Sequence, residues 1–230
     1  MKQIEYYQMK RVLILGATGF VGRNFLETTK DYDEFEFICT ARQKFANLIQ
    51  SPNIKWLYGD LENEDFLKEI FLSNPELILN FFWKGLPTRT NDLNDLNYLI
   101  QCKLIERVKS NGSTIYSFGS GLEFIAENMP KSDNSSSFSS EHFALTKRKL
   151  HSYLMEKEVN HIWIRPFYIY GRWQNPKSLL GSIIISYLNG KEFSSNNLDQ
   201  VHDFTAISDL MKAMHYLIKN KPENKEFNVG

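Results

Sequence analysis

The sequence predicts an α/β protein built on a doubly wound parallel sheet, and two observations carry this prediction. Short apolar runs alternate along the chain with longer segments of helical periodicity, the order expected when each strand is followed by a covering helix. The apolar runs are continuous rather than interrupted at every second residue, which is typical of parallel strands that are covered on both faces.

The chain up to Arg165 supplies most of these elements. Its apolar runs predict strands at 11–15, 35–40, 54–58, 76–83, 113–118 and 161–165. The segments between them predict helices at 20–30, 63–72, 93–110 and 141–158.

After Arg165 the spacing of the elements changes. We expect a helix at 178–190 that ends on Gly190, a polar irregular piece, a helix at 207–219 and a last strand at 226–230. This part is predicted to be a smaller lobe threaded onto the sheet. The segment 131–140 is rich in Ser and Asn, which favours a mobile loop that caps the next helix.

Composition excludes several classes of protein. The hydrophobic fraction of 42% is that of a globular chain rather than a disordered or fibrous one. With 27 basic and 27 acidic residues the formal net charge is zero, so we expect neither nucleic acid nor an acidic membrane surface as a partner. Small or locally recognised partners fit better.

The cysteines and the N-terminal stretch indicate a cytoplasmic protein. Cys39 and Cys102 lie far apart in apolar settings, so we expect two reduced core thiols, no redox pair and no metal site. The opening stretch MKQIEYYQMKRVLILG has no apolar run ahead of the first strand and no small-residue cleavage site. No stretch approaches the ~20 apolar residues of a membrane span.

The stretch GATGFVG predicts a dinucleotide site. It places Gly16, Gly19 and Gly22 directly after the first strand, where they open the first helix. Glycines there allow a tight turn and a close approach to a pyrophosphate, whose charge is met by amides at the helix N-terminus. In this strand-turn-helix setting an ordinary connecting turn is the minority interpretation.

The ends of the second and third strands bear on which dinucleotide binds. The second strand ends on Thr40 and Arg42 without an acidic residue, and a guanidinium suits a 2′-phosphate, so NADP is favoured with NAD as the alternative. A solvated surface arginine is the competing interpretation. Asp60 and Leu61 lie where a carboxylate can accept from the adenine amino group, although Asp is also a common helix cap.

The predicted helix at 141–158 carries a lysine inside an apolar stripe. Phe143, Lys147, Leu150 and Leu154 fall on one face, which we expect to pack on the sheet. Either the lysine stem packs while its ammonium reaches water, or the lysine holds a ribose and lowers the pKa of a neighbour.

Several motifs occur together in a fixed order: GATGFVG, GDL at 59–61, SFGSG at 117–121, the aromatic-x-x-x-Lys pattern, IRPFYIYG at 164–171 and HDFTAISDL at 202–210. From about Lys10 to Gly230 the chain therefore resembles the extended short-chain dehydrogenase/reductase family, specifically its nucleotide-sugar epimerases, dehydratases and 4-ketoreductases. The stretch FYIYGRWQNPKSLL is most similar to members of surface-polysaccharide pathways.

This resemblance implies a Rossmann fold and a set of site residues. Residues 1–230 would form one unit, with a dinucleotide-binding core at 9–170 and a shortened substrate lobe mainly at 171–230, to which a returning helix and strand belong. The resemblance implies a cofactor site formed by Gly16, Thr18, Gly19, Phe20, Val21, Gly22, Arg42, Asp60, Leu61, Trp83 and Lys147. It implies a substrate site formed by Ser120, Gly121, Arg172, Ser178 and His202, the last in place of the family's usual arginine.

The resemblance also implies catalytic roles for Ser120 and Lys147, with Phe143 at the position of the family's catalytic tyrosine. Loss of a general acid-base group typically costs ~10² to 10⁴ in rate. Three explanations are open: an enzyme whose tyrosine was replaced to trap substrate, a natural pseudoenzyme that binds NADP(H) as a sensor or partner protein, or another proton donor. His142 is the weakest choice of donor, because consecutive helical residues point about 100° apart.

Retention of Ser120 and Lys147 favours an enzyme template. We therefore expect an NAD(P)-dependent 4-ketoreductase or epimerase of a nucleotide-activated deoxysugar, impaired by Phe143, with the non-catalytic binding protein as the alternative. The family also implies a homodimer formed through the helices near 91–110 and 141–158.

Overall fold

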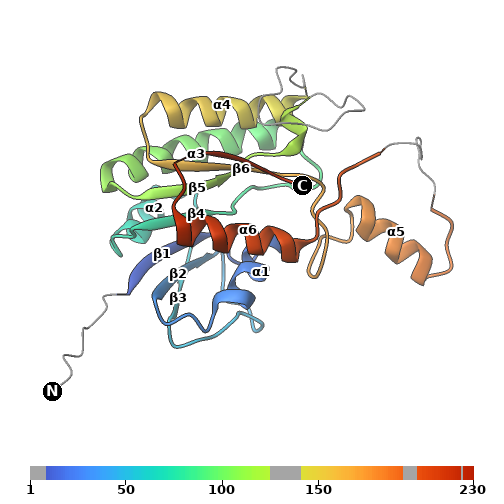
Figure 1. Ribbon diagram of the computed structural model, residues 1–230, viewed down its shortest axis with the longest axis horizontal. Coiled ribbons are helices and arrows are strands. Elements are labelled where there is room, and N and C mark those ends of the chain that lie inside the picture. Colours follow the sequence, from blue (N-terminus) through green and yellow to red (C-terminus); the bar gives the residue numbers. More distant parts are fainter. Residues whose placement is uncertain (1–8, 125–140, 194–200, 224) are drawn as a thin grey trace. The chain divides into compact units, whose positions relative to one another are not determined.

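The computed structural model describes residues 9–124, 141–193, 201–223 and 225–230, and it contains a parallel sheet with flanking helices (Figure 1). The seven strands follow the order β3-β2-β1-β4-β5-β6-β7. Their bounds are Lys10–Leu15 (β1), Phe35–Ala41 (β2), Ile54–Tyr58 (β3), Leu77–Asn80 (β4), Thr114–Phe118 (β5), His161–Pro166 (β6) and Glu226–Val229 (β7).

The helices lie close to the predicted ranges. They are Phe20–Thr29 (α1), Glu64–Phe71 (α2), Asn91–Asn111 (α3), His142–Glu156 (α4), Leu179–Leu188 (α5) and Ile207–Asn220 (α6), with a short 3₁₀ helix at Gly121–Glu123 (η1). None of these described helices combines the length and the apolar character needed to cross a bilayer. The predicted serine-rich loop at 131–140 lies outside the described residues.

The predicted strand at 76–83 is wrong at its C-terminal end, since β4 stops at Asn80. The Asn97 side chain forms hydrogen bonds with both backbone polar groups of Lys84. Its Oδ1 accepts from the Lys84 amide at 2.8 Å, and its Nδ2 donates to the Lys84 carbonyl oxygen at 3.0 Å. The apolar residues that follow β4 therefore lie in a loop tied to α3 rather than in the sheet.

The chain divides into two compact units. The first contains the chain up to Phe82 together with Ile100–Ser117 and Tyr153–His161, and the second contains Trp83–Leu99, Phe118–Ser152 and Ile162–Gly230. The predicted division into a core at 9–170 and a lobe at 171–230 remains a prediction.

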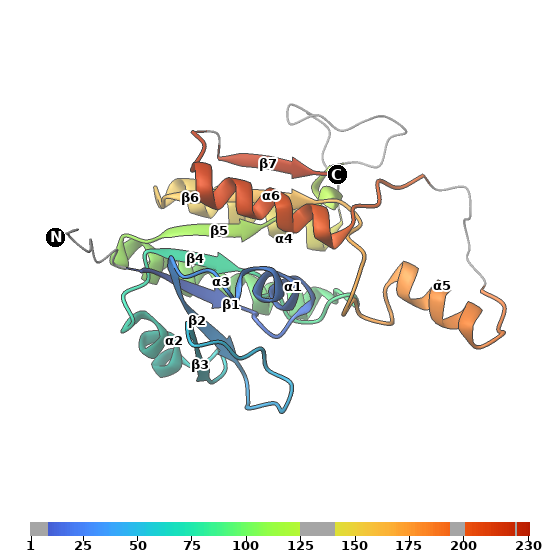
Figure 2. The ribbon, with the colours of Figure 1, turned by 60° about the horizontal axis from the view of Figure 1, so that its bottom comes forward.

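The first unit is held together by parallel strands with nearly continuous burial. Figure 2 shows β3, β2, β1 and β4 side by side in this order. The register pairs Leu13 with Ile38 across β1 and β2, and with Ile78 across β1 and β4. The side chains of all three are at most 1% exposed, so the sheet supplies the core of this unit.

The second unit carries the aligned stripe of α4. The exposed fractions of Phe143, Lys147, Leu150 and Leu154 are 5%, 5%, 2% and 0%, which confirms the predicted buried face. β7 pairs in parallel with β6, with Ile164 opposite Phe227. By contrast, none of the residues of α5 is buried.

Candidate functional site

The glycine loop after β1 makes a close approach that only glycine permits. Gly16 has φ +72°, and a Cβ built there would lie 2.9 Å from backbone atoms of Phe81 and Phe82. A Cβ on Gly22 would lie 2.4 Å from the Gly16 carbonyl oxygen. The loop is therefore pressed between the exit of β4 and the first turn of α1, at the switch point where β1 has neighbours on both sides.

The N-terminus of α1 fits a phosphate group. Its N-cap is Gly19, which offers no side-chain oxygen to the free amides, and the first turn contains no acidic residue. The Gly19 amide donates to the Gly16 carbonyl oxygen at 2.9 Å, which fixes the turn. Uncapped amides at the positive end of a helix dipole are suited to the pyrophosphate of a dinucleotide.

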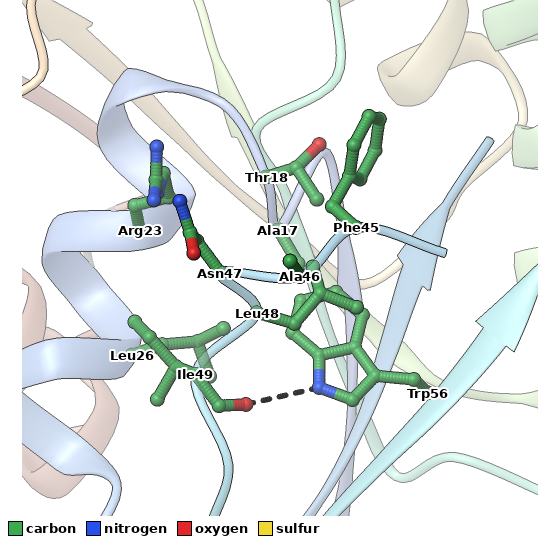
Figure 3. Close-up of a pocket in the computed structure, with 10 residues that line it drawn as sticks. All are labelled: Ala17, Thr18, Arg23, Leu26, Phe45, Ala46, Asn47, Leu48, Ile49 and Trp56. Carbon is green, nitrogen blue, oxygen red and sulfur yellow. Dashed lines mark hydrogen bonds between the residues drawn. The ribbon is translucent and has the colours of Figure 1, made fainter. Parts of the chain in front are cut away.

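A cavity of about 350 Å³ lies in the same unit, between this loop and the segment that follows β2 (Figure 3). The Trp56 indole N–H donates to the Ile49 carbonyl oxygen at 3.0 Å and so closes one side. The lining residues are Ala17, Thr18, Arg23, Leu26, Phe45, Ala46, Asn47, Leu48, Ile49 and Trp56. None of these described lining residues is acidic, and Arg23 supplies a cation.

The structure places the other predicted cofactor residues of this unit in different settings. Arg42 is exposed, and the Thr40 hydroxyl is buried and donates to the Ile14 carbonyl oxygen at 3.3 Å. Asp60 Oδ1 accepts from the Glu62 amide at 3.0 Å, so it caps a turn, and the Leu61 side chain is buried. Sequence reasoning missed Arg23 and residues 45–49, because only the fold brings the segment after β2 to α1.

The second unit gathers Trp83, Phe143 and Lys147. The Lys147 Nζ donates to the Phe118 carbonyl oxygen at 2.7 Å and lies 3.5 Å from the centroid of the Trp83 ring. The Trp83 and Phe143 rings meet edge to face at 5.7 Å. The ammonium is thus held by a carbonyl and an aromatic face, and the structure excludes the interpretation in which it reaches bulk water.

Burial lowers the pKa of Lys147 to about 7, and the negative charge of Glu123 raises it against this effect. A buried ammonium loses hydration, which favours the neutral amine. At neutral pH a large fraction of this side chain is therefore the neutral amine, unlike a surface lysine.

Ser120 and Gly121 lie in the turn that follows Phe118, whose carbonyl oxygen accepts from Lys147. The Ser120 hydroxyl oxygen accepts from the Leu122 amide at 3.2 Å, and the Glu123 side chain accepts from the Ser120 amide at 2.8 Å. A Cβ on Gly121 would lie 2.5 Å from the Phe167 ring. Ser120 is half-buried, and toward the described residues its hydroxyl acts as an acceptor, from Leu122, and not as a donor.

Sequence reasoning missed Arg89. Its guanidinium lies 5.2 Å from the centroid of the Phe143 ring and pairs with Glu141 at 3.1 Å. The ring at the position of the expected phenol therefore contacts both the Trp83 ring and the Arg89 guanidinium. Because Arg89 and Phe143 belong to separate segments, no local pattern indicated this contact.

His142 pairs with Asp95, its Nε2 lying 2.9 Å from the carboxylate oxygen. His142 is half-buried, and its partner Asp95 lies on α3. The pairing gives no support to His142 as the proton donor.

The predicted substrate residues after β6 occupy three separate places. The Arg172 guanidinium lies 4.3 Å from the centroid of the Trp173 ring. The Ser178 hydroxyl oxygen caps α5 by accepting from the Gly181 amide at 3.3 Å. The His202 ring lies against the Tyr168 ring at a tilt of 30°, with ring centroids 4.0 Å apart. Their roles toward a substrate remain predictions.

Cys39 and Cys102 are not bonded to each other or to another cysteine. Cys39 is buried, and burial raises the pKa of its thiol. Cys102 is only half-buried, so its assignment to the core was wrong.

A parallel sheet with a glycine loop at its switch point, followed by a helix whose N-terminus has no side-chain cap, defines a fold of the Rossmann class. The chain belongs to the NAD dependent epimerase/dehydratase family, whose model matches residues 12–230. The predicted family and fold class are thereby confirmed.

Three known proteins illustrate what this chain is similar to. GDP-6-deoxy-D-talose 4-dehydrogenase from Aggregatibacter actinomycetemcomitans is 22% identical over 95% of this chain and 74% of the relative. The structure of dTDP-glucose 4,6-dehydratase from Bacillus anthracis with NAD matches with a TM-score of 0.80 at 18% identity, over 96% of this chain and 75% of its own. The structure of UDP-glucuronic acid 4-epimerase from Bacillus cereus, with UDP-glucuronic acid and NAD, matches with a TM-score of 0.83 at 16% identity. The match covers 96% of this chain and 77% of the epimerase chain.

Proposed function

We propose that this chain is an NAD(P)-dependent 4-ketoreductase or epimerase of a nucleotide-activated deoxysugar, with its proton transfer impaired by Phe143. The observation that carries the proposal is the Lys147 ammonium, held between the Phe118 carbonyl and the Trp83 ring beside the Ser120 turn. The likeness to a 4-dehydrogenase of a GDP-deoxysugar supports the substrate class. A role in surface-polysaccharide synthesis fits this substrate.

The glycine loop and the cavity support the cofactor assignment. The pyrophosphate would lie at the amides of α1, with Phe20 and Val21 in its first turn, and the adenosine half toward Thr18, Arg23 and Asn47. We propose NADP rather than NAD, because Arg23 lines the cavity and no described lining residue is acidic. Arg42 does not line the cavity, but it directly follows β2, at the start of the segment whose residues 45–49 do. Bound NAD(P) supplies or accepts the hydride.

The residues of the second unit would hold the sugar and handle its proton. The Ser120 hydroxyl is suited to donate a hydrogen bond to the reacting oxygen, and Lys147 to hold a ribose hydroxyl. Among the described residues, the solvent-shielded indole N–H of Trp83 has no hydrogen-bond partner, which supports a polar ligand here. Phe143 offers no proton, so the slow step would be proton transfer to or from the sugar oxygen.

The non-catalytic alternative has one specific observation in its favour. Arg89 lies on the Phe143 ring and is tied to Glu141, so the space next to the ring is engaged by the protein itself. A protein that binds NADP(H) and acts through a partner would tolerate this arrangement.

The decisive experiment is Phe143→Tyr, assayed for NADPH oxidation with a panel of nucleotide 4-keto sugars. We expect a gain of about 10² in rate or more, because the phenol restores a general acid beside Lys147. The control is the double variant Phe143→Tyr with Lys147→Met, in which the gain should be lost. A Tyr variant that binds NADPH but stays inert on the whole panel would favour the binding protein.

A further inference from the structure

Glu123 is a buried carboxylate to which the proposed reaction assigns no part. It lies at the end of η1 and is 1% exposed. The carboxylate accepts from the Ser120 amide at 2.8 Å, from Arg165 Nε at 2.8 Å and from the Trp163 indole N–H at 3.4 Å. A carboxylate so deeply buried needs this many donors to remain charged.

The turn Phe118–Ser120 connects this carboxylate to Lys147. The Phe118 carbonyl accepts from the Lys147 Nζ, and the Ser120 amide donates to Glu123, so one residue separates the two contacts. That residue is Gly119, where an added Cβ would lie 2.2 Å from Glu123 Oε1 and 2.5 Å from Trp163 Nε1. The glycine leaves room for the carboxylate to lie against the backbone of the turn.

Within the described part of the chain, the groups around Lys147 can be named. Its own neighbours are the Trp83 and Phe143 rings and the Phe118 carbonyl, and Arg89 lies over the Phe143 ring. Arg148, the next residue on α4, donates to the Glu123 carbonyl oxygen at 3.1 Å. Arg165 on β6 pairs with both Glu123 and Glu226. Glu123 is the carboxylate whose charge acts on Lys147.

We propose that Glu123 is a positioning residue whose carboxylate fixes the Phe118–Ser120 turn and supplies the negative charge that balances the buried Lys147 ammonium. This inference rests on the proposed function, because it concerns the same Ser120 and Lys147. It adds a residue that lines neither the cofactor cavity nor the substrate positions predicted from the sequence.

Glu123→Gln tests the charge while keeping the size of the side chain and one acceptor for the Ser120 amide. The direct readout is the titration of the Lys147 side chain by NMR, assigned through the loss of its signal in Lys147→Met. The midpoint should fall by about one pH unit, because the carboxylate no longer favours the charged amine. If the protein binds NADPH, the midpoint of the pH dependence of its NADPH affinity should also fall.

Glu226→Gln is the matched control. Glu226 also pairs with Arg165, at 2.8 Å, but it lies on β7 rather than on η1 beside the Ser120 turn. It should leave the Lys147 midpoint unchanged. Equal shifts in both variants, or no shift in Glu123→Gln, would overturn the proposal.

Glu123→Asp keeps the test available if the Gln variant does not fold. The charge remains for Arg165, so the Lys147 midpoint should stay in place while the Ser120 amide loses its acceptor and exchanges its proton faster. A midpoint that falls in the Asp variant contradicts the proposal. The NMR titration needs no ligand, so a protein that binds neither NADPH nor a sugar nucleotide would refute the proposed function without deciding the role of Glu123.

Discussion

Lys147 holds an ammonium where the protein leaves it little contact with water. The side chain is 5% exposed and rests against the Trp83 ring and the Phe118 carbonyl. Its pKa of about 7 lies well below the ~10.4 of a free lysine side chain. Between these two values the unfolded chain binds a proton that the folded chain does not, so the stability of the folded state rises with pH across this window.

Lys147→Met should remove this dependence. Relative to the Met variant, the unchanged protein should gain about 1.4 kcal/mol per pH unit in the free energy of unfolding between about pH 7 and 10. Urea unfolding of both proteins at pH 7, 8 and 9 measures the difference. Parallel curves for the two proteins would contradict the shifted pKa.

Arg23 and Arg42 carry the proposed preference for NADP. Replacing either by Gln should weaken NADPH binding about tenfold and leave NADH binding unchanged, because only the 2′-phosphate needs the cation. Calorimetry with both nucleotides measures the ratio. Lys55→Gln, an exposed cation on β3 outside the cavity lining, is the control. An equal loss for both nucleotides would assign the arginines to another part of the cofactor.

At the scale of elements, the glycine loop and α4 are held by different kinds of contact. The loop is defined by backbone contacts, since Gly16 leaves no room for a side chain against the exit of β4. α4 is defined by side-chain packing, since its four-residue stripe is buried while Leu145 and Lys149 between these positions are exposed.

Gly16→Ala and Gly112→Ala form a matched pair for the loop. Both glycines have φ +72°, but an added Cβ at Gly112 meets nothing within 4 Å. Gly112→Ala should therefore cost about 1 kcal/mol of stability from backbone strain alone. Gly16→Ala should cost at least about 1 kcal/mol more, because its Cβ meets backbone that has no room to move.

Thermal or urea unfolding measures both glycine variants, and NADPH binding should be lost only in Gly16→Ala. Equal destabilisation of the two variants would show that the close approach at β4 contributes nothing.

At the scale of the whole molecule, a buried ionic group joins segments that are far apart in the chain. Arg165 is 7% exposed and lies on β6, where it bonds Glu123 across 42 residues of sequence and pairs with Glu226 on β7. Such a group adds little net stability compared with apolar packing, but removing one partner leaves a buried charge uncompensated.

Arg165→Met should therefore destabilise the protein by about 3–5 kcal/mol, measured by urea unfolding at neutral pH. The triple variant, with Glu123→Gln and Glu226→Gln added, should recover most of this loss because no unpaired buried charge remains. A single variant as stable as the unchanged protein would mean that water reaches Glu123.

Much of the fold followed from local pattern. Local patterns placed the ends of six strands to within one residue. β4 was predicted three residues too long at its C-terminal end, because the Asn97 side chain of α3 bonds the backbone that follows it. The predicted burial of Phe143, Lys147, Leu150 and Leu154 on one face of α4 was correct, because helical periodicity depends only on the spacing of residues in the sequence. The predicted substrate residues remain untested.

By itself the sequence determined the fold class, the family, the glycine loop and the placement of Phe143 and Lys147 on one helical face, since each depends on the type and spacing of neighbouring residues. Only the tertiary structure decided that Arg89 lies over the Phe143 ring and that Arg23 lines a cavity. The same holds for the buried network in which Glu123 accepts from the Ser120 amide and from Arg165. These are contacts between segments that are distant in sequence, and they depend on how the elements pack rather than on any local pattern.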